Sequence, residues 1–204
     1  MNRSHGQPVR GKVTTLGPTG TDAQAEAARH FAEVFLEGSF ESAMRAAFRT
    51  GTHALVAAGF VERSGERVTD LWVNLHFRHL ARMRIVGVWE SPTKPMCVAT
   101  GPSLSGLTDA RADVPSNAPS VARSVALHPA TEVFTERFTP QAERQYVDAK
   151  PLAVQRVVDG MADSCVGSLD VVERHPTLTV CEVLRPSMVW ILYRPFPQRE
   201  LPHP

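Results

Sequence analysis

Three short turns in the sequence carry the residues best suited to bind an anion: residues 18–22, 128–131 and 149–152. Each follows a predicted strand and opens a predicted helix. The first amides of a helix have no partner within it, and the helix dipole favours negative charge there. In an open α/β sheet such turns border the crevice where ligands bind. The residues therefore predict a site for a small dicarboxylate, although any α/β protein has turns of this kind.

Other chemistry is less well supported by the sequence. His76 and His79 are three residues apart, a spacing compatible with two metal ligands on one helical face, but no third or fourth ligand accompanies them. We therefore predict histidines at the surface or at a cleft edge, and no metal or cofactor. Gly17-Pro18-Thr19-Gly20 lacks the Gly-Lys-Ser/Thr ending of a phosphate loop. No dinucleotide fingerprint, nucleophile elbow or Cys-Xaa-Xaa-Cys pair occurs, so the residues alone predict no particular reaction.

The composition excludes several classes of protein. Among 204 residues, 43% are hydrophobic and 21% charged, as in ordinary soluble domains. The net charge of +1 argues against a nucleic-acid partner. Residues 1–12 are polar, and no apolar run approaches the ~18 residues of a membrane span. Cys97, Cys165 and Cys181 are odd in number and lie in apolar surroundings, which is typical of reduced core residues. We predict a cytoplasmic protein without membrane contact.

Strands and helices alternate along most of the chain, which predicts an α/β fold of two lobes with parallel sheets and a cleft between them. The period of the apolar residues predicts one helix from Thr21 to Gly38 and a second from Ser39 to Gly51. Residues 59–70 are predicted to be a loop, and residues 101–122 an irregular stretch. Apolar runs, together with the repeated order of strand, turn and helix, predict strands at 13–16, 53–58, 83–89, 96–100, 124–127, 144–147, 164–167, 178–184 and 188–193. Further helices are predicted at 70–75, 131–138, 151–159 and 169–173.

The segment Leu16-Gly17-Pro18-Thr19-Gly20-Thr21 resembles the opening signature of the prephenate dehydratases. Later segments are similar to that family in the same order, so the resemblance covers about residues 13–194. It implies a two-lobed, type II periplasmic-binding-protein-like fold, a homodimer, and prephenate or a relative held between the lobes. The implied arrangement is a flexible N-terminus at 1–12, lobe 1 at 13–95 plus about 185–194, lobe 2 at 96–184, and a flexible tail at 195–204. The segments in question are 40–51, 53–58, 68–71, 83–89, 95–98, 128–129, 152–160 and 164–168.

Two departures from the dehydratase pattern change the expected reaction. The family's Thr-Arg-Phe, whose Thr is the expected acid for expelling the ring hydroxyl, is replaced by Ser187-Met188-Val189-Trp190. The pattern of Met188, Trp190, Leu192 and Tyr193, with no regulatory ACT domain expected, resembles the bacilysin-type prephenate decarboxylases. The resemblance thus implies decarboxylation of prephenate without aromatisation, in the biosynthesis of a non-proteinogenic amino acid of the bacilysin or anticapsin kind.

The resemblance also implies roles for individual residues. Thr19, Gly20 and Thr21 would hold a carboxylate, and Met188 and Trp190 would shape the ring pocket.

The proton donor to the ring carbon has three titratable candidates, His128, His76 and His79. Ala149 and Lys150 stand where the family has a carboxylate-binding Ser-Thr pair, and Lys150 would replace two hydroxyl bonds with one charge. Two alternatives stay open: a dehydratase that uses another acid, and a non-catalytic protein of the same fold that binds a small acid.

Overall fold

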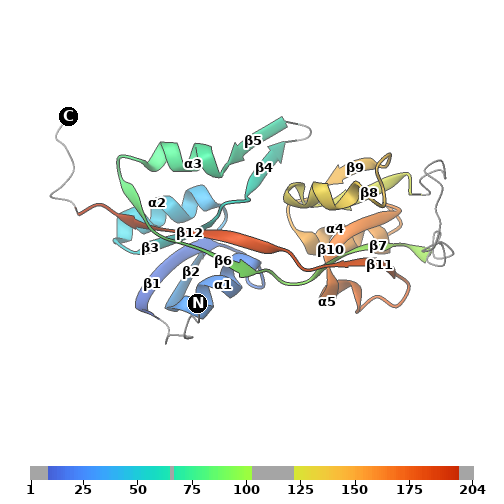
Figure 1. The fold of residues 1–204 in the computed structure, drawn as a ribbon, viewed down its shortest axis with the longest axis horizontal. Helices are drawn as coiled ribbons and strands as arrows, with labels where there is room; N and C mark the ends of the chain where they lie inside the picture. The colour runs from blue at the N-terminus through green and yellow to red at the C-terminus, as the bar shows by residue number, and fades with distance from the viewer. Residues whose placement is uncertain (1–8, 65–66, 103–121, 198–204) are drawn as a thin grey trace. The chain divides into compact units, whose positions relative to one another are not determined.

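The computed structural model describes residues 9–64, 67–102 and 122–197, and these form two compact units (Figure 1). Unit 1 takes its described residues from the ranges Met1–Glu62, Val68–Ser91 and Ser187–Pro204. Unit 2 takes them from Arg63–Arg67 and Pro92–Pro186. The chain therefore passes between the two units at 91/92 and at 186/187.

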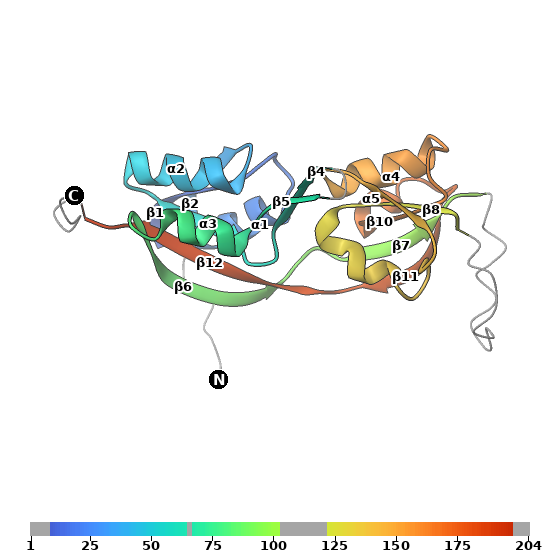
Figure 2. The same ribbon diagram turned by 90° about the horizontal axis from the view of Figure 1, so that it is seen from above.

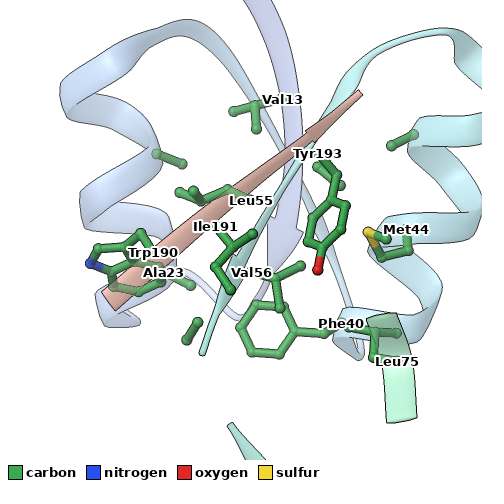
Figure 3. Close-up of a cluster of buried hydrophobic side chains, with 14 of the residues drawn as sticks. Val13, Ala23, Phe40, Met44, Leu55, Val56, Leu75, Trp190, Ile191 and Tyr193 are labelled. Atoms are coloured by element: carbon green, nitrogen blue, oxygen red, sulfur yellow. The ribbon is translucent and has the colours of Figure 1, made fainter. Parts of the chain in front are cut away.

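Unit 1 is built on a mixed five-stranded sheet with the order β2-β1-β3-β12-β6. Strand β1 runs parallel to both β2 and β3, whereas β12 runs antiparallel to β3. Helices α1 and α2 flank the strands on opposite sides (Figure 3), and α3 contacts α2. The bounds are β1 Val9–Leu16, α1 Asp22–His30, β2 Phe31–Glu37, α2 Phe40–Thr50, β3 His53–Ala57, α3 Trp72–His79, β6 Met83–Pro92 and β12 Ser187–Pro195.

The core of unit 1 fills both faces of this sheet (Figure 3). Leu55 and Val56 of β3 are fully buried, as is Met44 of α2. Tyr193 and Trp190 come from β12; Tyr193 lies on the side of α2 and Trp190 on the side of α1, beside Ala23. Because each buried side chain of this size stabilises the fold by roughly 1.5–3 kcal/mol, these residues fix both helices against the sheet.

The predicted helix from Thr21 to Gly38 is wrong in its second half. Helix α1 ends at His30, and Phe31 is already extended, with φ −127° and ψ 146°. The chain continues as β2, paired in parallel with β1 from Lys12↔Glu33 to Leu16↔Glu37. The backbone bonds to β1 and the burial of Phe31 outweigh the helical spacing of the apolar residues. The second helix follows the prediction, with Ser39 as its N-cap and Gly51 in the left-handed conformation at φ 71°.

Two further boundaries differ from the sequence-based expectation. The predicted loop at 59–70 contains a two-stranded sheet, formed by β4 (Val61–Ser64) and β5 (Arg67–Leu71). Strand β1 begins at Val9, so residues 9–12 belong to the sheet and not to a flexible end. Both segments are polar, and backbone pairing with a neighbouring strand compensates for their lack of an apolar signal. Most of the predicted irregular stretch 101–122 lies outside the described residues.

Unit 2 has a second five-stranded sheet, with the order β11-β7-β10-β8-β9. Strands β10, β8 and β9 are parallel, and β7 is antiparallel to β10 and β11. Helix α4 packs on one face and the 3-10 helix η2 on the other (Figure 2). The bounds are β7 Met96–Thr100, β8 Ser124–Leu127, η2 Pro129–Thr135, β9 Glu143–Tyr146, α4 Lys150–Val158, β10 Ser164–Ser168, α5 Leu169–Val172 and β11 Thr179–Leu184.

The cysteines of unit 2 are free thiols, as predicted. Cys97 and Cys165 are buried, and burial raises the pKa of each to about 12. Within the described residues, no helix is long and apolar enough to cross a membrane.

Candidate functional site

Several predicted site residues of unit 2 come together at one edge of its sheet. Because β8, β9 and β10 are parallel, their carboxyl ends meet at the same edge. His128 directly follows β8, Lys150 follows β9 after a short turn, and Ser168 ends β10. Strand β7 runs the other way, so its first residue, Met96, lies opposite Ser168 at this edge. We call the group formed by Met96, His128, Lys150 and Ser168 the strand-end site.

Lys150 brings a positive charge into the strand-end site. It is the first residue of α4, and its Nζ lies 3.4 Å from Sδ of Met96. The preceding residue, Ala149, is the N-cap and makes no side-chain capping bond, because it has no side-chain oxygen. A lysine and the start of a nine-residue helix both favour negative charge at this place. The arrangement suits a carboxylate.

His128 is held in one tautomer beside Lys150. Its Nδ1 accepts a hydrogen bond of 3.2 Å from the backbone N–H of Ala130, so the neutral ring carries its proton on Nε2. Burial lowers the pKa of His128, the charge of Lys150 lowers it further, and Asp148 acts in the opposite direction. The lowered pKa favours the neutral ring, whose proton on Nε2 is available to donate a hydrogen bond.

A second group of side chains borders the strand-end site and escaped the sequence analysis. Arg63 pairs with Glu132 of η2, with an N–O distance of 3.2 Å, and its guanidinium lies 4.8 Å from the ring centroid of Tyr146. Tyr146 ends β9 and is paired with Leu127, the residue before His128. Burial raises the pKa of Tyr146, and Glu132 raises it further. Arg63 and Glu132 are 69 positions apart, so no motif in the sequence connects them.

In unit 1, the predicted anion turn is a firmly capped helix start. The hydroxyl of Thr21 accepts a bond from Gln24 N–H at 3.2 Å and donates to Leu16 O at 3.1 Å. The N–H of Gly20, which has φ 93°, donates to Oε1 of Gln24 at 2.6 Å. Thr19 is exposed. Two of the three predicted ligands thus already bind Gln24 at the start of α1: Thr21 through its hydroxyl and Gly20 through its N–H.

His76 and His79 lie on α3 in unit 1, whereas His128 belongs to unit 2. Nδ1 of His76 is 3.1 Å from the hydroxyl of Tyr193, which also accepts a bond from Trp72 Nε1 at 2.9 Å.

His79 is 5% exposed, and its Nε2 lies 3.1 Å from a carboxylate oxygen of Glu41. The two histidines of α3 thus have separate hydrogen-bond partners. The i, i+3 spacing that suggested a shared role is explained by two independent packing contacts.

Met188 and Trp190, the predicted wall of the ring pocket, belong to strand β12. Trp190 is 2% exposed and lies in the core, opposite Ala57 of β3. Met188 is half-buried, and its Sδ would lie 3.2 Å from a Cβ placed on Gly59. The glycine therefore makes room for the methionine. Met188 is the more accessible of the two for a bound molecule.

A buried carboxylate in unit 1 was also missed by sequence reasoning. Glu26 of α1 is 2% exposed, and its Oε1 accepts a 2.6 Å bond from Nε1 of Trp89 and lies 2.9 Å from Nε2 of His30. Its Oε2 accepts a 2.9 Å bond from Arg29. Burial raises the pKa of Glu26, but the hydrogen bonds from Trp89 and His30 help to lower it below its ordinary value. The ionised carboxylate of Glu26 therefore connects α1 to Trp89 of β6.

The sequence matches no family model and no curated protein. The structure is similar to the prephenate dehydratase of Arthrobacter aurescens, solved with L-Phe, with a TM-score of 0.53 and 16% identity over 91% of this chain and 61% of that one. It is also similar to the prephenate dehydratase of Staphylococcus aureus, with a TM-score of 0.50 and 13% identity over 92% of this chain and 68% of that one. This chain thus spans about three fifths of the length of the first of these proteins. The chain has the fold of the prephenate dehydratases, which confirms the fold class predicted from the sequence.

Proposed function

We propose that the chain binds prephenate, or a closely related dicarboxylate, and removes carbon dioxide from it while keeping the ring hydroxyl. The observation that carries the proposal is the strand-end site. There, Lys150, the neutral His128 and the start of α4 gather at the carboxyl edge of three parallel strands. The proposed setting is the biosynthesis of a non-proteinogenic amino acid of the bacilysin or anticapsin kind.

The chemistry of decarboxylation decides which carboxylate Lys150 would hold. The bond from the ring carbon to the leaving carboxylate breaks, its electron pair moves into the ring diene, and a proton is added at a ring carbon. A cation on the leaving carboxylate would stabilise the ground state more than the transition state, in which that charge is dispersed. We therefore assign the side-chain carboxylate, which is retained, to Lys150 and the start of α4. The leaving carboxylate needs surroundings without a cation.

His128 is also the proposed proton donor to the ring carbon. A dianion bound beside it would raise its pKa, and protonation would end the bond that Nδ1 accepts from the Ala130 N–H, because a protonated nitrogen cannot accept a hydrogen bond. His76 and His79 are less suited, because Tyr193 and Glu41 already occupy one nitrogen of each ring. Expulsion of the hydroxyl would require a second acid. The resemblance places that acid in the segment Ser187–Trp190, which has no threonine.

The product of an incubation with prephenate tests the reaction. Mass spectrometry and proton NMR are expected to show the loss of carbon dioxide alone, with the ring hydroxyl and a non-aromatic ring retained. Phenylpyruvate, formed by the loss of both carbon dioxide and water, would refute decarboxylation without aromatisation and favour the dehydratase alternative. Unchanged prephenate, together with saturable binding, would favour a non-catalytic binding protein.

Lys150→Met tests the site itself, because methionine keeps the length and apolar character of the lysine side chain. Hydrogen bonds to charged groups contribute about 1.5–3 kcal/mol, so the dissociation constant for prephenate is expected to rise about 10- to 100-fold. Lys12→Met is the matched control. Lys12 lies on β1 of unit 1 in an exposed pair with Glu33, and its replacement is expected to leave binding unchanged. Equal effects of the two substitutions would reject the strand-end site.

A further inference from the structure

Ser168 carries a buried hydroxyl that makes no hydrogen bond within the fold. It ends β10, is 6% exposed and stands at the N-cap position of α5, yet its side chain makes no capping bond. Within the part of the chain that the structure describes, the hydroxyl has no other hydrogen-bond partner either. A buried hydroxyl is normally paired, because an unpaired one loses its bonds to water without replacement. The hydroxyl of Ser168 is therefore available to a bound molecule.

Ser164, on the same strand, shows the usual arrangement. It is fully buried, and its hydroxyl donates a 2.9 Å bond to the backbone oxygen of Ser124. Because side chains alternate along a strand, Ser164 and Ser168 lie on the same face of β10. The two serines thus differ in one respect: the hydroxyl of Ser164 joins β10 to β8, whereas that of Ser168 joins nothing in the described residues.

The neighbours of Ser168 indicate what kind of molecule it can bind. Ser168 lies directly opposite Met96 in the antiparallel pair of β10 and β7, and Cβ atoms of such pairs are about 4.5–5.5 Å apart. Sδ of Met96 lies 3.4 Å from Nζ of Lys150. The hydroxyl of Ser168 and the ammonium of Lys150 are therefore both neighbours of the Met96 side chain. A carboxylate has two acceptor oxygens, so a single carboxylate at this place can accept from both groups.

We propose that Ser168 is a further ligand-binding residue of the strand-end site, and that its hydroxyl donates a hydrogen bond to the carboxylate that Lys150 holds. The inference rests on the proposed function insofar as a dicarboxylate binds at this site, and it holds whichever bond the reaction breaks. A hydrogen bond to an ionised carboxylate is stronger than one between neutral groups. The hydroxyl also adds no charge, so it fixes the retained carboxylate without bringing a second cation towards the leaving one.

A pair of alanine substitutions on β10 tests the inference. Ser168→Ala is expected to raise the dissociation constant for prephenate about tenfold, because it removes a bond to a charged group, and to leave the urea midpoint unchanged. Ser164→Ala is the matched control. It removes the bond to Ser124 and is expected to lower the urea midpoint while the dissociation constant stays within about twofold of the wild type. Titration calorimetry measures binding, and circular dichroism in urea measures stability.

A double-mutant cycle with Lys150→Met tests whether both residues bind the same carboxylate. If they do, the loss of Lys150 loosens that carboxylate, and the effect of Ser168→Ala is expected to shrink from about tenfold to about twofold or less. Independent effects, with the same tenfold loss in both backgrounds, would overturn the assignment of Ser168 to the carboxylate of Lys150.

Failure of the inference can be told apart from failure of the proposed function. An unchanged dissociation constant in Ser168→Ala, or a loss of stability equal to that of Ser164→Ala, would overturn the inference and leave the proposed function standing. If the wild type binds no prephenate, the proposed function fails, and the same variants are titrated with succinate as the dicarboxylate probe. Absence of succinate binding would then overturn the inference as well.

Discussion

The buried carboxylate of Glu26 is expected to be one of the strongest single polar anchors of unit 1. Glu26→Gln keeps the shape of the side chain but turns one acceptor oxygen into an NH2 donor. At least one of the N–H groups that bind the Glu26 carboxylate then faces this NH2 group and loses its acceptor. Hydrogen bonds to a charged group contribute about 1.5–3 kcal/mol each. Arg29 is 57% exposed and His30 44% exposed, so solvent screens their contributions and the bond from Trp89 dominates. We expect the substitution to lower the free energy of unfolding by about 2 kcal/mol.

A double-mutant cycle isolates the bond between Glu26 and Trp89. Urea unfolding followed by circular dichroism would be measured for the wild type, Glu26→Gln, Trp89→Phe and the double variant. The expected coupling energy is about 1–2 kcal/mol. Glu33→Gln is the matched control, because Glu33 is 53% exposed in its pair with Lys12 and is expected to contribute less than about 0.5 kcal/mol.

The pH dependence of the free energy of unfolding shows whether the ionised form of Glu26 stabilises the fold. The folded-state pKa of Glu26 is lowered from 4.5, so its stabilisation is present above the unfolded value and is lost as the pH falls through the folded value. The difference between wild type and Glu26→Gln should therefore be full at pH 7 and shrink in acid below about pH 4.5. A coupling energy near zero, or a difference that grows in acid, would refute the reasoning.

Three more outcomes are expected. Tyr193→Phe removes the acceptor of the Trp72 Nε1 bond in a fully buried place, and is expected to cost about 1–3 kcal/mol in urea unfolding; no loss would mean that the indole finds another acceptor. When a dicarboxylate binds, His128 is expected to take up a proton, because the pKa of His128 is lowered in the free protein and a nearby anion raises it. Calorimetry in two buffers of different ionisation enthalpy measures this uptake. If no proton is taken up, the anion binds elsewhere. Cys97 and Cys165, with pKa values of about 12, are expected to resist iodoacetamide until the protein is unfolded, and rapid labelling of the native protein would contradict their burial.

The structure also changes which variant is informative at the anion turn. Thr21→Ala would have been a direct test of substrate binding if the hydroxyl faced a ligand alone. Because Thr21 caps α1, its removal is expected to cost about 0.5–2 kcal/mol of stability as well. Thr19 is exposed and takes no part in the capping bonds of Thr21 and Gly20. Thr19→Ala is therefore the better variant for testing whether this turn holds a carboxylate.

The sequence predicted the residues of the candidate site that directly follow strands along the chain. His128 and Lys150 each follow a segment that the sequence analysis predicts as a strand. Parallel neighbouring strands then bring both residues to one edge of the sheet. Their proximity was therefore predictable once the strands were recognised. Met96 was not predictable in the same way, because its place opposite Ser168 depends on β7 running antiparallel to β10.

The sequence by itself determined where local chemistry decides the structure. Ser39 and Thr21 cap helices and Gly51 ends one, because each acts through atoms within a few residues of itself. Tertiary structure decided the rest. Residues 31–37 became β2 because β1 offered backbone partners, although their spacing suits a helix.

In the same way, Glu26 finds Trp89 63 positions away, and Arg63 finds Glu132 69 positions away. Burial strengthens such contacts, but no local pattern marks them, since either partner alone looks like an ordinary surface residue. The contacts of Glu26 with Trp89 and of Arg63 with Glu132 therefore depend on the assembled tertiary structure.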